Sequence, residues 1–244
     1  MSKIRADELV FRLGLAPSRS NASQMIKEGL VLLPDGTPVR KPGQMLDSTI
    51  VITATETMKY VSRGAGKLLA ALDAFNPEIA GRTALDLGAS TGGFTDVLLS
   101  YGAAKVFAVD VGTGQLHEKL RSDSRVVSLE QTNARDLDRT LIPEQIQILT
   151  GDLSFISLTK VLPACVPLLA DDFFAILLIK PQFEAERGEI GSGGVVRSPE
   201  VRARCVAKIV DFAVNELHWH HIGTIESPVI GPNGNHEFLA AFRG

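Results

Sequence analysis

The stretch Arg82-Thr-Ala-Leu-Asp-Leu-Gly-Ala-Ser-Thr-Gly-Gly-Phe-Thr95 decides the fold of this chain. Its apolar run at 84–87 predicts a short buried strand, its glycines predict a tight turn, and the pattern at 94–99 predicts the start of a helix. A turn without side chains lets a ligand approach the backbone closely. We therefore expect a nucleotide-like cofactor to lie across the carboxyl end of this strand.

The spacing of the turn glycines is G-x-x-x-G-G, which differs from two common nucleotide motifs. It is not the dinucleotide pattern G-x-G-x-x-G, and it is not a P-loop because no Gly-Lys-Ser/Thr follows. A second buried strand is predicted at 105–109, and Asp110 follows it, where a carboxylate can accept both hydroxyls of a ribose. Together with Asp86 in the first strand, this pattern resembles the S-adenosylmethionine site of Rossmann-like methyltransferases. An ordinary nucleotide fold with another ligand is the alternative.

The expected cofactor site draws on the ends of four strands. Asn133 follows a third strand at 126–129, where this fold places the adenine edge, and Asp152 ends a fourth strand at 146–152. The predicted cofactor-binding residues are Asp86, Gly88, Ser90, Gly92, Gly93, Phe94, Asp110, Asn133 and Asp152.

The composition is that of a globular chain of 244 residues, with 45% hydrophobic and 22% charged residues, so a substantial core is expected. The two cysteines are too few for a disulfide framework and lack zinc-ligand spacing, which suits a reducing cytoplasm. No secretory signal opens the sequence. The longest apolar run, 173–179, is far short of the ~20 residues that a membrane helix needs. We expect a cytoplasmic protein without membrane or metal.

The first 59 residues differ in charge from the remainder. They carry a net charge of +2, whereas the remainder carries −5. Apolar spacing predicts a helix at 5–15 and a second helix with Ser20 as N-cap and Gly29 just past its end. Strands at 30–33 and 37–39 flank a predicted β-turn, and a later strand is expected at 50–52. The weaker pattern at 53–59 predicts a linker between domains 1–59 and 60–244.

This small α+β unit resembles the RNA-binding domain first seen in the fourth small-subunit ribosomal protein, particularly across 18–31. The resemblance implies contact with structured RNA, which is recognised by shape and phosphates. A helical dimerisation cap is the alternative. The implied RNA-binding residues are Arg5, Arg12, Arg19, Lys27 and Lys41.

The second domain is expected to be α/β and Rossmann-like, with a seven-stranded, mostly parallel sheet. A fifth strand at 173–179 is entirely apolar and delivers Lys180. Because an unpaired buried ammonium is costly, Lys180 requires a partner, and Asp152 is the candidate. Lys67 at a helix start and Glu237 at the start of a final strand are expected at the same sheet edge. Two lysines interleaved with two acids suit the deprotonation of a poorly acidic hydroxyl.

Five motifs, at 60–64, 86–95, 151–157, 178–184 and 231–238, give a resemblance that covers essentially the whole chain. The chain is similar to the hemolysin A (TlyA) family of ribosomal RNA 2′-O-methyltransferases, whose catalytic domain is of the FtsJ type. The resemblance implies an S-adenosylmethionine-dependent rRNA (cytidine-2′-O)-methyltransferase that acts on ribosomal RNA within ribosomal subunits. It also implies the catalytic tetrad Lys67, Asp152, Lys180 and Glu237. The chain departs from the family motif at Ala65 and Gly66.

Competing functions make different demands on the same positions. Methylation of an adenine amino group requires Asn/Asp-Pro-Pro-Tyr/Phe after the fourth strand, where this chain has Asp-Leu-Ser-Phe. Methylation of a base carbon requires a nucleophilic cysteine, and neither cysteine lies at a strand end. A membrane-active hemolysin has no support in the sequence. The strongest remaining alternative is an RNA-binding or ribosome-assembly factor that retains the fold without catalysis.

Overall fold

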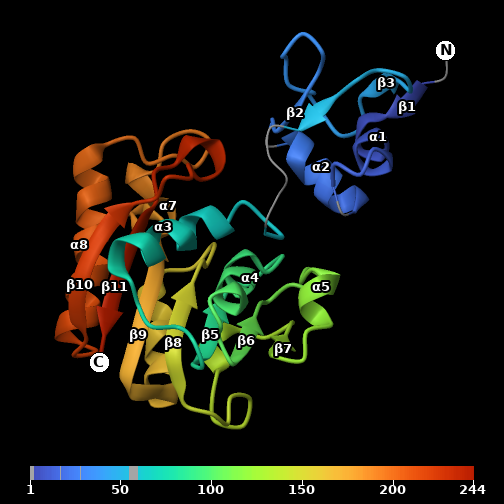
Figure 1. The fold of residues 1–244 in the computed structure, drawn as a ribbon. Coiled ribbons are helices and arrows are strands. Elements are labelled where there is room, and N and C mark those ends of the chain that lie inside the picture. The colour runs from blue at the N-terminus through green and yellow to red at the C-terminus, as the bar shows by residue number, and fades with distance from the viewer. Residues whose placement is uncertain (1–2, 17, 28, 55–59) are drawn as a thin grey trace. The chain divides into compact units, whose positions relative to one another are not determined.

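The computed structural model describes residues 3–16, 18–27, 29–54 and 60–244. The chain divides into two compact units, residues 1–62 and 63–244 (Figure 1). Most of the predicted linker at 53–59 lies outside the described residues, and the domain bounds 1–59 and 60–244 stay a prediction. No helix among the described residues is long and apolar enough to cross a membrane.

The first unit packs two helices against two small antiparallel sheets. Strand β1 pairs with β3, and β2 pairs with β4. Its own core forms around buried Leu9, Val10, Met25 and Ile26, so the helices are held by an apolar interface. The elements are β1 (Lys3–Arg5), α1 (Ala6–Arg12), α2 (Arg19–Lys27), β2 (Val31–Leu32), β3 (Met45–Asp47) and β4 (Thr53–Ala54).

The predicted N-cap of the second helix is wrong. Oγ of Ser18 accepts a hydrogen bond from the backbone N–H of Asn21 at 3.1 Å, and Ser20 lies inside the helix. A cap bonds the N–H two or three residues later, and that N–H is the unpaired one of the first helical turn. The predicted helix end is confirmed, because Gly29 has φ +73° and its N–H donates to the carbonyl of Ile26 at 3.1 Å.

The strands of the first unit were predicted less well. The turn is confirmed by the bond from Gly36 N–H to the Leu33 carbonyl at 2.9 Å. The segment after it forms only an isolated bridge between Leu32 and Pro38. The strand expected at 50–52 is wrong, since the partner of β2 is β4 at 53–54. Strands of two or three residues carry too little alternation to be placed by pattern.

The second unit is a seven-stranded sheet with helices, in the order β10-β11-β9-β8-β5-β6-β7. Strands β9, β8, β5, β6 and β7 run parallel, and β11 runs antiparallel to both β9 and β10. The prediction of a seven-stranded, mostly parallel sheet is confirmed. The elements are α3 (Ala65–Phe75), β5 (Thr83–Leu87), α4 (Gly93–Ser100), β6 (Lys105–Val109), α5 (Glu118–Arg121), β7 (Val126–Leu129), β8 (Ile146–Gly151), α6 (Leu162–Cys165), β9 (Leu169–Ile179), α7 (Pro181–Glu184), α8 (Pro199–Asn215), β10 (His220–Glu226) and β11 (Phe238–Arg243).

The central strands are apolar along their length because both faces are buried. Leu85, Leu87, Leu149 and Leu177 are fully buried, as is typical of parallel strands covered on two sides. Because β5, β6, β8 and β9 run parallel, their carboxyl ends share one edge of the sheet. The start of antiparallel β11 reaches the same edge, because Phe238 pairs with Ile179.

Candidate active site

The glycine turn after β5 holds two backbone segments in close contact. The N–H groups of Gly88 and Ala89 both donate to the Val109 carbonyl, at 2.9 and 3.0 Å. Gly88 has φ +77°, and a Cβ there would lie 2.7 Å from the backbone oxygen of Asp152. Only glycine satisfies both conditions. The turn therefore brings the end of β8 directly against the end of β5.

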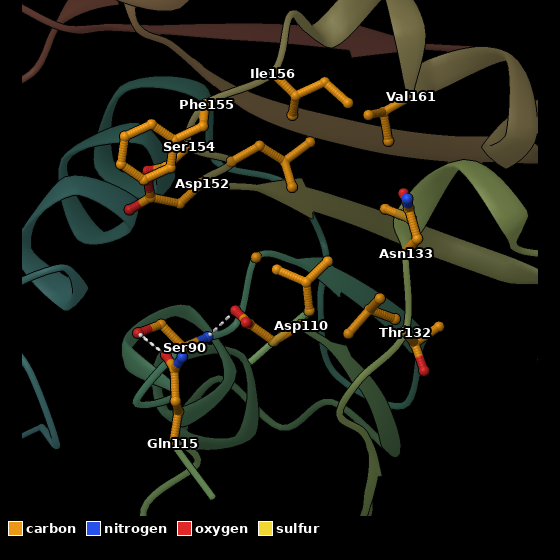
Figure 2. Close-up of a pocket in the computed structure, with 15 residues that line it drawn as sticks. Ser90, Asp110, Gln115, Thr132, Asn133, Asp152, Ser154, Phe155, Ile156 and Val161 are labelled. Carbon is orange, nitrogen blue, oxygen red and sulfur yellow. Dashed lines mark hydrogen bonds between the residues drawn. The ribbon is translucent and has the colours of Figure 1, made fainter. Parts of the chain in front are cut away.

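A cavity of about 430 Å³ opens beside this turn, within the roughly 300–1,000 Å³ of small-molecule sites. Figure 2 shows Ser90, Asp110 and Gln115 on one side of it and Asp152, Ser154 and Phe155 on the other. The cavity has a polar rim and an apolar wall. Its apolar members include Val109, Val111, Leu153, Ile156 and Val161.

Asp110 is fixed at the cavity by two backbone groups. Its Oδ2 accepts from the N–H of Ser90 at 2.8 Å (Figure 2), and its Oδ1 accepts from the N–H of Gly112 at 2.7 Å. An ionised carboxylate has about four acceptor positions. Two backbone bonds therefore leave Asp110 able to accept the two hydroxyls of a ribose.

Asp86, which was predicted among the cofactor-binding residues, does not line the cavity. It is fully buried, and its oxygens accept from Oγ1 of Thr95 at 2.7 Å and Oγ1 of Thr150 at 3.0 Å. Burial raises the pKa of the Asp86 carboxyl to about 6. Asp86 ties β5 to α4 and β8 beneath the glycine turn.

Gly92, Gly93 and Phe94 also lie outside the lining of the cavity. Gly92 has φ +95°, and a Cβ there would collide with the side chains of Leu116 and Leu120. These three residues belong to the junction between the turn and α4, whose first residue is Gly93. They shape the turn, whereas Gly88, Ser90, Asp110, Asn133 and Asp152 face the cavity.

The polar cavity residues Gln115, Thr132 and Ser154 were not predicted. Gln115 bonds to Ser90, since its side-chain oxygen accepts from Oγ at 3.1 Å. Asn133 was predicted, and its oxygen accepts the N–H of Arg135 at 3.1 Å. Gln115 follows a glycine-containing loop without periodic pattern, so no sequence signal marked it.

The four residues predicted as a catalytic tetrad meet at one point. Nζ of Lys67 lies 2.7 Å from Oε2 of Glu237 and 3.5 Å from Oδ2 of Asp152. Nζ of Lys180 lies 2.5 Å from Oδ1 of Asp152. The order of contacts is therefore Glu237, Lys67, Asp152, Lys180. Each ammonium neighbours a carboxylate, and Asp152 joins the two lysines.

Three members of the tetrad are buried, and Asp152 is partly exposed. Lys67 is 7% exposed, Lys180 8% and Glu237 1%. Buried charges persist only when paired, and the alternation of two cations with two anions meets this condition. Oε1 of Glu237 is buried and has no hydrogen-bond partner among the described residues. Asp152 belongs both to the tetrad and to the cavity wall.

The loop after Asp152 contributes residues that sequence reasoning missed. Nζ of Lys180 donates to Oγ of Ser154 at 2.9 Å. Phe155 is 90% exposed with φ +65°, and its ring lies 5.1 Å from that of Phe183. An exposed aromatic residue in a left-handed conformation is unusual. The nearness of both residues to Asp152 in the sequence was the one available signal.

The RNA-binding residues predicted in the first unit differ in their contacts and in whether they line a surface hollow. Arg5 and Arg19 both contact the buried carboxylate of Asp7, at 2.7 and 3.5 Å, and Arg5 lines a surface hollow together with Arg12. Lys41 lines a second hollow of the same unit, and Lys27 is exposed and lies in neither. Across the described part of the chain, no three potential metal ligands come together.

Two protein families match the two units. FtsJ-like methyltransferases match residues 60–244, and the S4 domain matches residues 4–49. The chain is 47% identical over 243 residues, or 99% of its own length and 90% of the relative's, to the 16S/23S rRNA (cytidine-2′-O)-methyltransferase TlyA of Mycobacterium tuberculosis. It is 41% identical to Hemolysin A of Brachyspira hyodysenteriae, over 98% of this chain and 99% of that one.

A solved structure agrees with the sequence relatives. The protein "Putative hemolysin from Streptococcus thermophilus" superposes with a TM-score of 0.78 at 41% identity, covering 100% of this chain and 89% of that one. A fibrillarin of Aeropyrum pernix, solved with S-adenosyl-L-methionine, shares the fold alone, with a TM-score of 0.52 at 17% identity over 73% of this chain and 74% of that one.

Proposed function

Because the chain belongs to the FtsJ-like methyltransferases, and within them to the TlyA and hemolysin A family, we propose that it methylates a ribose 2′-oxygen of ribosomal RNA with S-adenosylmethionine. One observation carries this proposal. The tetrad of Lys67, Asp152, Lys180 and Glu237 lies beside a nucleoside-sized cavity and shares Asp152 with it. A methyl donor in the cavity and a hydroxyl at the tetrad would thus be adjacent.

The residues of the cavity fit an adenosine-type cofactor. Asp110 would accept the ribose hydroxyls, and Asn133 would bond the adenine edge beside the apolar wall. Gly88 allows the ligand to approach the backbone, where a Cβ has no space. When bound, S-adenosylmethionine supplies an electrophilic methyl group, so the protein has only to align and activate the acceptor oxygen.

Lys180 would accept the proton of the ribose hydroxyl as a general base. Asp152 holds its amine at 2.5 Å. Lys67 and Glu237, which contact each other at 2.7 Å, would position the ribose. Departure of the hydroxyl proton to Lys180 raises the electron density on the oxygen that attacks the methyl carbon.

The first unit would supply the affinity for RNA. The S4 match at residues 4–49 and the net charge of +2 over residues 1–59 support contacts to RNA phosphates. The residues proposed for these contacts are Arg5, Arg12, Arg19, Lys27 and Lys41. The names of its relatives point to a cytidine as the acceptor and to RNA within ribosomal subunits. An enzyme with this substrate would work in the cytoplasm.

Transfer of a labelled methyl group tests the proposal. Ribosomal subunits purified from cells that lack the gene are incubated with the protein and S-adenosylmethionine carrying a tritiated methyl group. We expect label in ribosomal RNA and a nucleotide linkage that resists alkali, because a 2′-O-methyl group blocks cleavage by the neighbouring oxygen. RNA binding without label would favour the non-catalytic assembly factor.

A further inference from the structure

The amine of Lys180 has two fixed partners within the protein. Nζ lies 2.5 Å from Oδ1 of Asp152 and donates to Oγ of Ser154 at 2.9 Å. The aromatic ring of Phe183 is a more distant neighbour, with its centroid 5.9 Å from Nζ. Asp152 holds one N–H of the Lys180 amine, but in a neutral amine the lone pair could then take either of the two remaining directions. Ser154 supplies the second contact.

Two contacts define the orientation of a tetrahedral nitrogen. Cε takes one of its four directions, Asp152 takes the second and Ser154 takes the third. The fourth direction is thereby determined. A neutral lysine amine has two N–H groups and one lone pair, so when both N–H groups are held by acceptors the lone pair takes that fourth direction.

We propose that Ser154 is a positioning residue for methyl transfer, which holds the second N–H of the neutral Lys180 amine so that the lone pair faces the acceptor hydroxyl. This inference rests on the proposed function, because it assigns the direction in which the proposed base works. Ser154 also lines the cofactor cavity. Ser154 therefore borders both the amine of Lys180 and the cavity proposed for the methyl donor.

The reaction releases one proton overall. The Lys180 ammonium first loses this proton to solvent, and the lone pair of the resulting neutral amine then takes the proton of the ribose hydroxyl. The O–H bond breaks, a bond forms between oxygen and the methyl carbon, and the electron pair of the cleaved S–C bond remains on sulfur. Lys180 ends as an ammonium whose third N–H lies where the lone pair was, so Asp152 and Ser154 keep their places as acceptors.

The loop that carries Ser154 is anchored at both ends. The N–H of Asp152 donates to the Leu87 carbonyl at 2.9 Å. Farther along, the buried carboxylate of Glu184 accepts from Oγ of Ser157 at 2.6 Å and from the N–H of Leu158 at 2.8 Å. Glu184 belongs to α7, which directly follows Lys180. Lys180 and Ser154 therefore lie on two segments that the contacts of Glu184 connect.

Replacement of Ser154 tests whether this residue affects the rate of methyl transfer without affecting the binding of cofactor and ribosomal subunits. Ser154→Ala removes the acceptor, and misalignment of a reacting group by about 1 Å costs on the order of 100-fold in rate. We expect the single-turnover rate at saturating S-adenosylmethionine and ribosomal subunits to fall by roughly 10- to 100-fold. Affinity for the cofactor and for the subunits should remain. Ser154→Thr keeps the hydroxyl on an exposed residue and should restore most of the rate.

Ser157→Ala is the matched control, because it removes a hydroxyl from the same loop that bonds Glu184 rather than Lys180. We expect it to retain several-fold more activity than Ser154→Ala. Equal losses in the two variants, or a Ser154→Thr protein as slow as Ser154→Ala, would overturn the positioning role. A wild-type protein without methyl transfer would overturn the proposed function itself, whereas a fully active Ser154→Ala protein would overturn only this inference.

Discussion

Nζ of Lys67 lies 2.7 Å from Oε2 of Glu237, although the two residues are 170 positions apart in the chain. The contact joins the first helix of the methyltransferase unit to the residue that precedes β11. Because Phe238 pairs with Ile179, Glu237 lies next to the end of β9, where Lys180 follows. The register of one antiparallel strand therefore places the fourth member of the tetrad.

Lys180→Ala should abolish methyl transfer and leave cofactor affinity nearly unchanged. Lys180 acts on the acceptor hydroxyl and does not line the cofactor cavity. General-base catalysis contributes about 10²- to 10⁴-fold, so the residual rate should fall by at least the lower value. Label transfer and calorimetry with S-adenosylmethionine measure the two effects.

Lys160→Ala provides the control for loss of a lysine in the same unit, since Lys160 is exposed. It should keep both activity and affinity. A folded Lys180→Ala protein that still methylates ribosomal RNA at the wild-type rate would refute the role of the base.

Asp110→Ala should weaken the binding of S-adenosylmethionine. The variant loses the acceptor for the ribose hydroxyls, and hydrogen bonds to a charged group contribute about 1.5–3 kcal/mol each, so we expect the Kd to rise roughly 10-fold or more. It also loses the bonds to the N–H groups of Ser90 and Gly112. Calorimetry measures the change, and unchanged affinity would rule out the assignment. Asp211→Ala on the exposed face of α8 is the control.

Asp86 should make the methyltransferase unit less stable as the pH rises. The pKa of its buried carboxyl is about 6 in the folded state against an ordinary value of 3.8. Below pH 3.8 the folded state has its full advantage from the protonated carboxyl, and this advantage is lost as the pH rises through 6. The difference of about two pKa units corresponds to about 3 kcal/mol.

Asp86→Asn tests this dependence, because an amide carries no charge at any pH. Relative to Asp86→Asn, the wild-type protein should lose on the order of 2–3 kcal/mol of unfolding free energy between pH 4 and pH 7. Urea unfolding followed by the fluorescence of Trp219, the single tryptophan, which is buried in this unit, gives the values. A constant difference across this range would show that Asp86 is not the titrating group.

Removal of the first unit should separate chemistry from RNA recognition. A chain that begins near Thr57 retains the cavity and the tetrad, since all of their residues lie beyond it. It should bind S-adenosylmethionine normally and methylate ribosomal subunits poorly. Full activity on the subunits would show that residues 1–59 do not supply the RNA affinity.

The sheet of the second unit could be predicted because its strands are buried on both faces. Runs such as 173–179 are apolar throughout and end at a charged residue, so their assignment as buried strands follows from hydrophobicity. The strands of the first unit could not be predicted from such a pattern. Its strands β2 and β4 have two residues each, and their pairing depends on how the turn at Gly36 and the two helices pack, which no local pattern encodes.

The candidate site was predictable where a charge interrupts an apolar pattern. Lys180 and Asp152 stood out for this reason, and they are in contact. The contacts of Asp86 could not be predicted, because the pattern shows that a carboxylate is buried but not which hydroxyl groups surround it. Ser154 was missed because a serine in a loop is ordinary, and only the fold reveals that its oxygen faces an amine.

The position of β11 between β9 and β10 has a consequence for the two parts of the site. The cavity is lined by residues between Gly88 and Val161, whereas Glu237 directly precedes β11. Strand β11 is the last strand in the chain, so the tetrad is completed only near the end of the chain, whereas every residue that lines the cavity precedes β11. Of the two parts of the site, only the tetrad therefore depends on β11.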